Sequence, residues 1–141
     1  STLSSSSAAS DVYKRQIMHC FSGGADLARE CVRHGAWLSF PGVLTFKNAE
    51  RTRQALHATP VDKILVETDA PFLTPHPRRG KRNGPYLIAH TIRFLSEQLD
   101  WDEASCCEQL RRNTLAAYGG PWEDVHGVTP LQLPASGEET R

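Results

Sequence analysis

The sequence lacks features that would place it in several common protein classes. No stretch approaches the roughly 18 consecutive apolar residues that a membrane-spanning helix needs. The 16 basic and 16 acidic residues cancel, so no bulk charge attracts the chain to nucleic acid or to a membrane, although a local basic patch is still allowed. The four cysteines form no C-x-x-C pair, so neither a disulfide framework nor a zinc knuckle is indicated. We therefore expect a soluble cytoplasmic protein with reduced thiols.

The two ends of the chain also lack a hydrophobic period. Six of the first ten residues are serine, and the apolar core of about seven residues that a secretory signal requires is missing. The string AASDVYKRQ resembles translated adapter sequence. We assign residues 1–16 to a disordered or artefactual lead and residues 17–120 to the folded part. Residues 121–141, rich in proline, glycine and polar residues, form a loosely ordered tail.

The hydrophobic pattern of the folded part alternates short strands with helices. The order β-α-β-α-β with short connections is typical of a parallel sheet with crossover helices, so the fold class is α/β. Asp102 is the expected N-cap of the last helix, which could be interrupted near Asn113, and Gly35 is the expected glycine after the first helix. The expected strands span residues 17–21, 36–40 and 63–68, and the expected helices span residues 25–34, 47–58, 86–99 and 102–118.

The third expected strand carries the first candidate chemistry. Residues 64–66 are a continuous apolar run without alternation, which indicates a strand covered on both faces. Glu67 and Asp69 follow directly, at the carboxyl end where α/β folds place their reactive groups. The alternative is that these two carboxylates only cap a loop or the next helix.

A histidine ends the first expected strand and adds a second kind of ligand. If the strands are parallel, His19 and Asp69 emerge on the same rim of the sheet, and an imidazole with a carboxylate suits a divalent metal ion. Asp69 could instead act as a general base that activates water. A single histidine before a turn is, however, more often a hydrogen-bonded structural residue.

A loop rich in proline and arginine follows the third strand, at residues 74–85. Its cations are Arg78, Arg79, Lys81 and Arg82. Arginine forks of this kind hold phosphates at the rim of a site. A solvated surface loop of the same composition is the alternative, and the position just after Asp69 favours phosphate contact.

Four motifs together resemble the C-terminal part of one family of hydrolases. They are HCFSGG, GAWLSFPGVLTFKNA, ETDAPFLTPHP and RGKRN, at residues 19–24, 35–49, 67–77 and 79–83. In this order and spacing they are similar to the TatD family of metal-dependent deoxyribonucleases. The resemblance implies that the chain is the C-terminal portion of a TIM (β/α)8 barrel, with about three parallel strands and flanking helices.

The resemblance also implies roles for individual residues. His19 would be a metal ligand, and Asp69 a ligand or the base that orients the attacking water. Glu67 would be a catalytic residue of the same motif, held nearby as a partner of the ligands. The ion would be Mg²⁺, Mn²⁺ or Zn²⁺, and the substrate DNA. The loop at the mouth of the site would contact the phosphate backbone through Arg79, Lys81, Arg82 and Asn83.

The sequence departs from the family pattern in ways that bear on activity. The His-x-His or His-x-Asp pair of the family's first strand, and a Glu and a His of its middle strands, are missing. Gly84 stands where many members carry glutamate. We therefore expect this chain to bind metal weakly and to hydrolyse little DNA. The alternatives are a hydrolase of another ester or amide bond on the same scaffold, and a non-catalytic truncated fragment.

Overall fold

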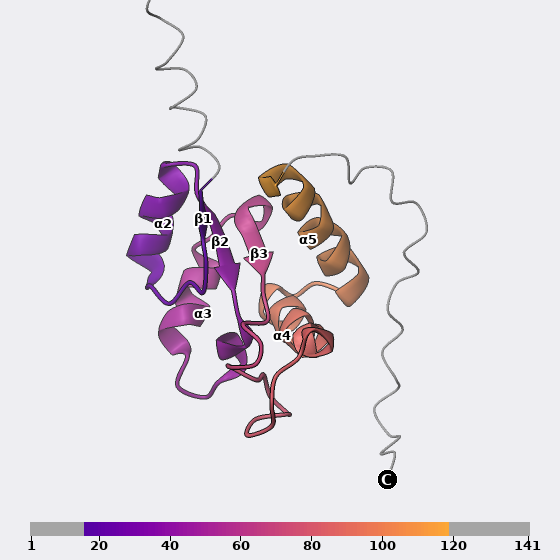
Figure 1. Cartoon of the computed structure of the whole chain (residues 1–141). Coiled ribbons are helices and arrows are strands. Elements are labelled where there is room, and N and C mark those ends of the chain that lie inside the picture. The colour runs from indigo at the N-terminus through magenta and orange to yellow at the C-terminus, as the bar shows by residue number, and fades with distance from the viewer. Residues whose placement is uncertain (1–15, 119–141) are drawn as a thin grey trace, which may run out of the picture.

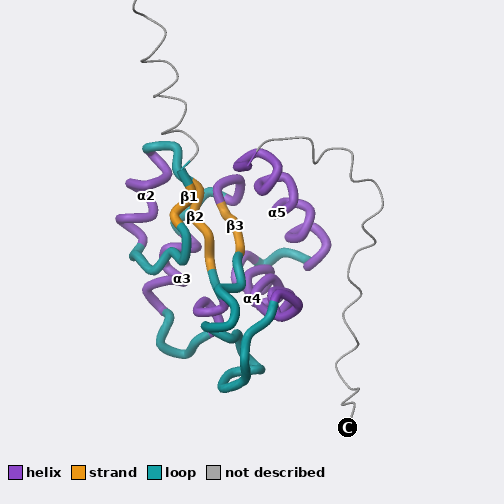
Figure 2. The backbone as a smooth tube through the Cα atoms, viewed as in Figure 1, coloured by secondary structure: helices purple, strands orange, loops and turns teal. Residues whose placement is uncertain are grey.

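The computed structural model describes residues 16–118, which form one sheet flanked by helices (Figure 1). The lead at residues 1–15 and the tail from residue 119 lie outside the described residues, so both assignments stay predictions. Strands and helices alternate along the first half of the chain, and two helices close it (Figure 2). The elements are β1 (Ile17–Met18), α2 (Ala25–Arg33), β2 (Trp37–Phe40), α3 (Glu50–His57), β3 (Ile64–Val66), α4 (Ile88–Leu99) and α5 (Glu103–Tyr118).

The sheet is parallel, with strand order β1-β2-β3. Ile17 pairs with Trp37, and Leu38 pairs with Ile64. The predicted parallel sheet with flanking helices is therefore confirmed. β1 is shorter than the predicted strand at residues 17–21, because the chain turns at Cys20, whose φ is 49°.

The ends of the helices show where a local sequence signal was sufficient to predict a helix boundary. α2 stops as predicted, since Gly35 has φ 83° and its N–H donates to the carbonyl of Val32 at 2.8 Å. α3 begins at Glu50, three residues later than predicted. The reason is Arg53, whose guanidinium donates to the carbonyls of Leu44, Phe46 and Lys47 and so holds this stretch in a turn.

The last helix is capped as predicted but is not interrupted. Asp102 accepts a hydrogen bond from the Ser105 N–H at 2.9 Å, and the hydrogen bonds from Ser105 lower the pKa of this carboxyl. α5 runs unbroken to Tyr118. Asn113 is buried, and its amide donates to the carbonyls of Val61 and Ile64, both at 2.7 Å. The residue that suggested a break instead joins α5 to the start of β3.

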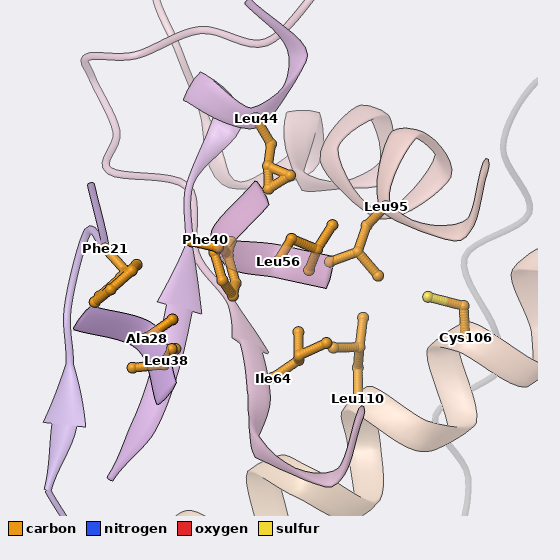
Figure 3. Packing of buried hydrophobic residues seen from close by; sticks show 11 residues of the cluster. Phe21, Ala28, Leu38, Phe40, Leu44, Leu56, Ile64, Leu95, Cys106 and Leu110 are labelled. Carbon is orange, nitrogen blue, oxygen red and sulfur yellow. The ribbon is translucent and has the colours of Figure 1, made fainter. Parts of the chain in front are cut away.

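The main core lies between one face of the sheet and all four helices (Figure 3). Leu38, Phe40 and Ile64 supply the sheet side, and Phe21 packs edge-on against Phe40 with ring centroids 6.0 Å apart. The helices contribute Ala28, Ala55, Leu56, Leu95, Cys106 and Leu110. Each large apolar side chain buried here contributes roughly 1.5–3 kcal/mol of stability, so the core holds the carboxyl ends of the strands in place.

A second buried cluster covers the other face of the sheet. It contains Trp37, Leu65 and Ala117, with Ile17 packed against it. Ile64 and Leu65 are 1% and 4% exposed, so β3 is buried on both faces, as its unbroken apolar run predicted. Among residues 16–118, no helix has the length and apolar character to cross a bilayer.

All four cysteines are free. Only Cys106 is fully buried, and burial raises the pKa of its thiol to about 11. Cys107, its neighbour on α5, is exposed. The thiols therefore play no covalent part in holding the fold together.

Replacing Asn113 with leucine should destabilise the fold. The change keeps the side-chain volume but removes the donor that two backbone carbonyls share, so the free energy of unfolding should fall by about 2 kcal/mol. Urea unfolding followed by circular dichroism measures this difference. Arg112→Ala, an exposed change one residue earlier on α5, is the control and should leave the urea midpoint nearly unchanged. Equal losses in the two variants would contradict the role assigned to Asn113.

Candidate metal centre

Three side chains capable of binding metal converge at the carboxyl end of the sheet. His19 follows β1 directly, and Glu67 and Asp69 follow β3, while β2 lies between these two strands. One ligand atom from each of the three residues lies within 4.8 Å of the others. The parallel topology therefore brings together His19 and Asp69, as expected from the sequence, and adds Glu67 to the same cluster.

Glu67 connects the two strand ends through both of its carboxylate oxygens. Oε2 is 2.7 Å from His19 Nδ1, and Oε1 accepts a hydrogen bond from the Cys20 N–H at 2.9 Å. A carboxylate only accepts hydrogen bonds, so this contact places the imidazole proton on Nδ1. Nε2, the other ring nitrogen, faces Asp69, whose Oδ1 lies 3.5 Å away.

This arrangement suits a divalent ion held by His19 and Asp69. A histidine that ligates metal usually donates its other ring proton to a carboxylate, which orients the ring and raises its basicity. An imidazole nitrogen with carboxylate oxygens is a suitable donor set for Mn²⁺ or Zn²⁺, and the oxygens also suit Mg²⁺. The side chains of His19 and Asp69 are 68% and 30% exposed, so the cluster is open to solvent.

The neighbouring thiol is not part of this donor set. Burial raises the pKa of Cys20, and the negative charges of Asp69 and Glu67 raise it further. The Cys20 sulfur is also not among the ligand atoms that converge within 4.8 Å of one another. The contribution of Cys20 is its backbone N–H, presented by the turn that ends β1.

The loop that carries Asp69 is held in an uncommon backbone conformation. Asp69 has φ 57°, a left-handed value that costs a non-glycine residue free energy. Its carbonyl accepts a hydrogen bond from the Phe72 N–H at 2.9 Å. Asn83 stabilises the same turn, because its amide donates to the carbonyls of Thr68 and Phe72, both at 2.6 Å.

The contacts of Asn83 revise one expectation from the sequence. Its side-chain oxygen accepts a hydrogen bond from the Gly84 N–H at 2.8 Å, and the residue is 6% exposed. Both amide protons are occupied, so no donor is free for a phosphate, and we interpret Asn83 as a residue that positions the Asp69 loop. The sequence signal for this role was an uncharged amide at the end of a cationic loop.

The basic loop lies at the same end of the sheet as the three candidate ligands (Figure 1). Arg79, Lys81 and Arg82 are all exposed. Arg79 places its guanidinium carbon 3.7 Å from the centroid of the Phe46 ring, a cation–π contact. Phosphate contacts by these three cations stay a prediction.

A family described as TatD-related DNase has a sequence model that matches residues 2–119. The metal-dependent hydrolase YabD of Bacillus subtilis is 49% identical over 81 residues, covering 57% of this chain and 32% of that protein. The metal-dependent hydrolase TatD of Mycobacterium tuberculosis is 43% identical over 106 residues, covering 75% of this chain and 40% of that protein. This chain thus spans less than half the length of these relatives.

Solved structures give the same result for the fold. The crystal structure of YjjV, a TatD homologue from Escherichia coli, superposes with a TM-score of 0.70 at 27% identity, covering 77% of this chain and 42% of that chain. A TatD family hydrolase from Entamoeba histolytica superposes with a TM-score of 0.64 at 14% identity and supports the fold alone. The predicted partial TIM barrel is therefore confirmed.

Replacing Glu67 with glutamine should weaken metal binding without unfolding the site. The amide cannot accept hydrogen bonds from both His19 Nδ1–H and the Cys20 N–H, so the ring loses its orientation. The Mn²⁺ dissociation constant, measured by electron paramagnetic resonance, should rise by about tenfold or more. Glu30→Gln is the matched control, because Glu30 on α2 forms a similar contact at 3.0 Å with His34, the residue that follows this helix. A similar rise in both variants would contradict this role.

Replacing Asn83 with alanine should loosen the turn that holds Asp69. The carbonyls of Thr68 and Phe72 lose their donors, so amide hydrogen exchange at Phe72 should accelerate by about tenfold. Thr74→Val removes a hydrogen bond to the carbonyl of Lys81 within the same loop and serves as the control. If exchange at Phe72 accelerates equally in both variants, Asn83 has no special role in this turn.

Proposed function

The chain belongs to the family of TatD-related DNases, and we propose that it supplies part of a metal centre that hydrolyses phosphodiester bonds, with DNA as the substrate. The observation that carries the proposal is the cluster of His19, Glu67 and Asp69 at the carboxyl end of the sheet. The relatives in Bacillus subtilis and Mycobacterium tuberculosis are both named as metal-dependent hydrolases, which supports the metal dependence of the proposed centre.

Each of the three residues has a distinct role in this proposal. His19 offers Nε2, and Asp69 offers a carboxylate oxygen, to Mg²⁺, Mn²⁺ or Zn²⁺. A bound ion of this kind supplies polarisation of a phosphoryl oxygen and a lowered pKa for water. Glu67 holds the imidazole in the tautomer that leaves Nε2 free. In this proposal Asp69 also accepts the proton of the attacking water.

The basic loop supports a phosphodiester as the substrate. Arg79, Lys81 and Arg82 are exposed on the loop that follows Asp69 and carry charge that complements a phosphate backbone. Hydrolysis of another ester or amide bond on the same scaffold would not need this cationic loop. The free thiols support our proposal of a cytoplasmic location.

The activity of this chain alone should be low but dependent on Asp69. His19 and Asp69 alone hold an ion more weakly than a complete ligand set does, so cleavage of a labelled DNA strand by excess protein should be slow. It should require a divalent metal, stop with EDTA and fall by a factor of about 100 or more in Asp69→Asn. Asp62→Asn is the control, because Asp62 is exposed at the opposite end of β3.

The same assay separates the alternatives. Cleavage of an aminoacyl ester in preference to DNA would replace the phosphodiester proposal with ester hydrolysis. DNA cleavage that survives both EDTA and Asp69→Asn would contradict a role for this metal centre. Rapid multiple turnover that Asp69→Asn abolishes would show that the expectation of low activity is wrong.

A further inference from the structure

One small polar side chain lies between the two strands that carry the candidate ligands. Ser39 belongs to β2, the strand that separates β1 from β3, and it is 4% exposed. Its neighbours Leu38 and Phe40 both belong to the main core (Figure 3). Because successive side chains of a strand point to opposite faces, Ser39 points to the face of the sheet that lies away from this core.

The strand register places Ser39 on the same face as two residues of the cluster. Leu65 pairs with Ser39 and belongs to the second buried cluster, so Glu67, two residues later, lies on that face as well. Ile17 packs against the second cluster, so His19, two residues later, follows it on this face. Ser39 therefore has His19 on the strand to one side of it and Glu67 on the strand to the other.

The hydrogen bonds at the end of β1 are rearranged beside Ser39. A regular parallel ladder would direct the Cys20 N–H to the carbonyl of Ser39, but the Phe21 N–H donates to this carbonyl instead, at 2.9 Å. Cys20 is thus the extra residue of a β-bulge, with φ 49°, and its N–H donates to Glu67 Oε1 at 2.9 Å. Bulges are common next to active sites, where they redirect a group towards the site.

The contact between His19 and Glu67 crosses the strand that carries Ser39. Neighbouring strands lie about 4.8 Å apart, so the 2.7 Å contact between His19 Nδ1 and Glu67 Oε2 spans β2, where the small side chain of Ser39 leaves room for it. Among residues 16–118 no hydrogen bond engages the Ser39 hydroxyl, and no enclosed side-chain oxygen is left without a partner. The Ser39 oxygen therefore keeps contact with solvent, and its proton is available to a ligand.

The three residues of the cluster offer no hydrogen-bond donor to the oxygen of a substrate. The carboxylates of Glu67 and Asp69 only accept hydrogen bonds, and the Nδ1–H of His19 is donated to Glu67. Hydrolysis increases the negative charge on an oxygen of the substrate, and donors held in place by the fold stabilise that charge. A serine hydroxyl is such a donor.

We propose that the Ser39 hydroxyl donates a hydrogen bond to a phosphoryl oxygen of the substrate, which makes Ser39 a further substrate-binding residue of this centre. The inference rests on the proposed phosphodiester hydrolysis and deepens it. All three strands then contribute to one site, because β1 and β3 lead to the candidate metal ligands and β2 supplies a donor between them.

Binding of inorganic phosphate to the full chain loaded with Mn²⁺ tests this inference, with the broadening of the phosphorus magnetic resonance signal as the readout. Ser39→Ala removes a hydrogen bond to a charged oxygen, so the phosphate dissociation constant should rise about tenfold. The Mn²⁺ dissociation constant, measured by electron paramagnetic resonance, should stay unchanged. Ser39→Cys keeps the shape of the side chain but offers only a weak donor, so it should lose phosphate affinity as well.

Ser96→Ala is the matched control. Ser96 is also a buried serine, but its hydroxyl donates to the carbonyl of Arg93 within α4 at 2.7 Å. This variant should change neither dissociation constant.

Four results would overturn the inference. They are the absence of phosphate binding by the parent at saturating Mn²⁺, equal phosphate affinity in the parent and Ser39→Ala, full affinity in Ser39→Cys, and an equal loss in Ser96→Ala. A rise in the Mn²⁺ dissociation constant of Ser39→Ala that matches the loss of phosphate affinity would also contradict it, because Ser39 would then act on the metal ligands. Phosphate binding that depends on Ser39, in a chain that cleaves no DNA, would count against the proposed hydrolysis alone.

Discussion

Parallel pairing of β2 with both of its neighbours is the constraint on which the candidate site depends. It directs the carboxyl ends of β1 and β3 to the same side of the sheet. His19 and Glu67 are 48 positions apart in the sequence, yet His19 Nδ1 lies 2.7 Å from Glu67 Oε2. An antiparallel neighbour would place one of these residues at the far end of the sheet. The core that fixes the pairing is apolar, and every polar group of the site stands just beyond it.

Two buried asparagines hold the two ends of β3 in the same way. Asn113 donates to the carbonyls of Val61 and Ile64 at its start, and Asn83 donates to those of Thr68 and Phe72 beyond its end. Each amide donates to two backbone carbonyls at once. The strand Ile64–Val66 has only three residues and therefore few ladder hydrogen bonds of its own. The two asparagine amides thus help to fix where β3 begins and where it ends.

The sequence predicts those features that depend on neighbours along the chain. Gly35 and Asp102 end and begin helices as expected, and the apolar run at residues 64–66 is a buried strand. The late start of α3 and the unbroken course of α5 were not predictable, because the deciding groups are Arg53 and Asn113, whose partners lie in other segments. Element boundaries are set by such tertiary hydrogen bonds more than by propensity.

The candidate site likewise combines features that the sequence predicts with features that only the folded chain shows. Convergence of His19 and Asp69 followed from the parallel topology, and the family resemblance indicated that Glu67 lies nearby. Neither could show that Glu67 uses both oxygens, one on His19 and one on the Cys20 N–H. The position of Asn83 in a cationic motif suggested a phosphate contact, whereas only the folded loop shows both amide protons engaged by carbonyls.

Acidic and basic side chains lie on opposite sides of one short turn, so a cation and an anion are attracted to different sides of the site. Glu67 and Asp69 supply negative charge on one side, which favours a bound cation. From residue 70 onward only positive charge follows, until Glu97. A phosphodiester strand is anionic along its length, so it is repelled by the carboxylates unless a metal ion neutralises them and is attracted by the loop in either case. If the chain acts on phosphodiesters as we propose, strand binding is separable from metal binding, whereas cleavage requires both, because the phosphate must approach the two carboxylates before it can react.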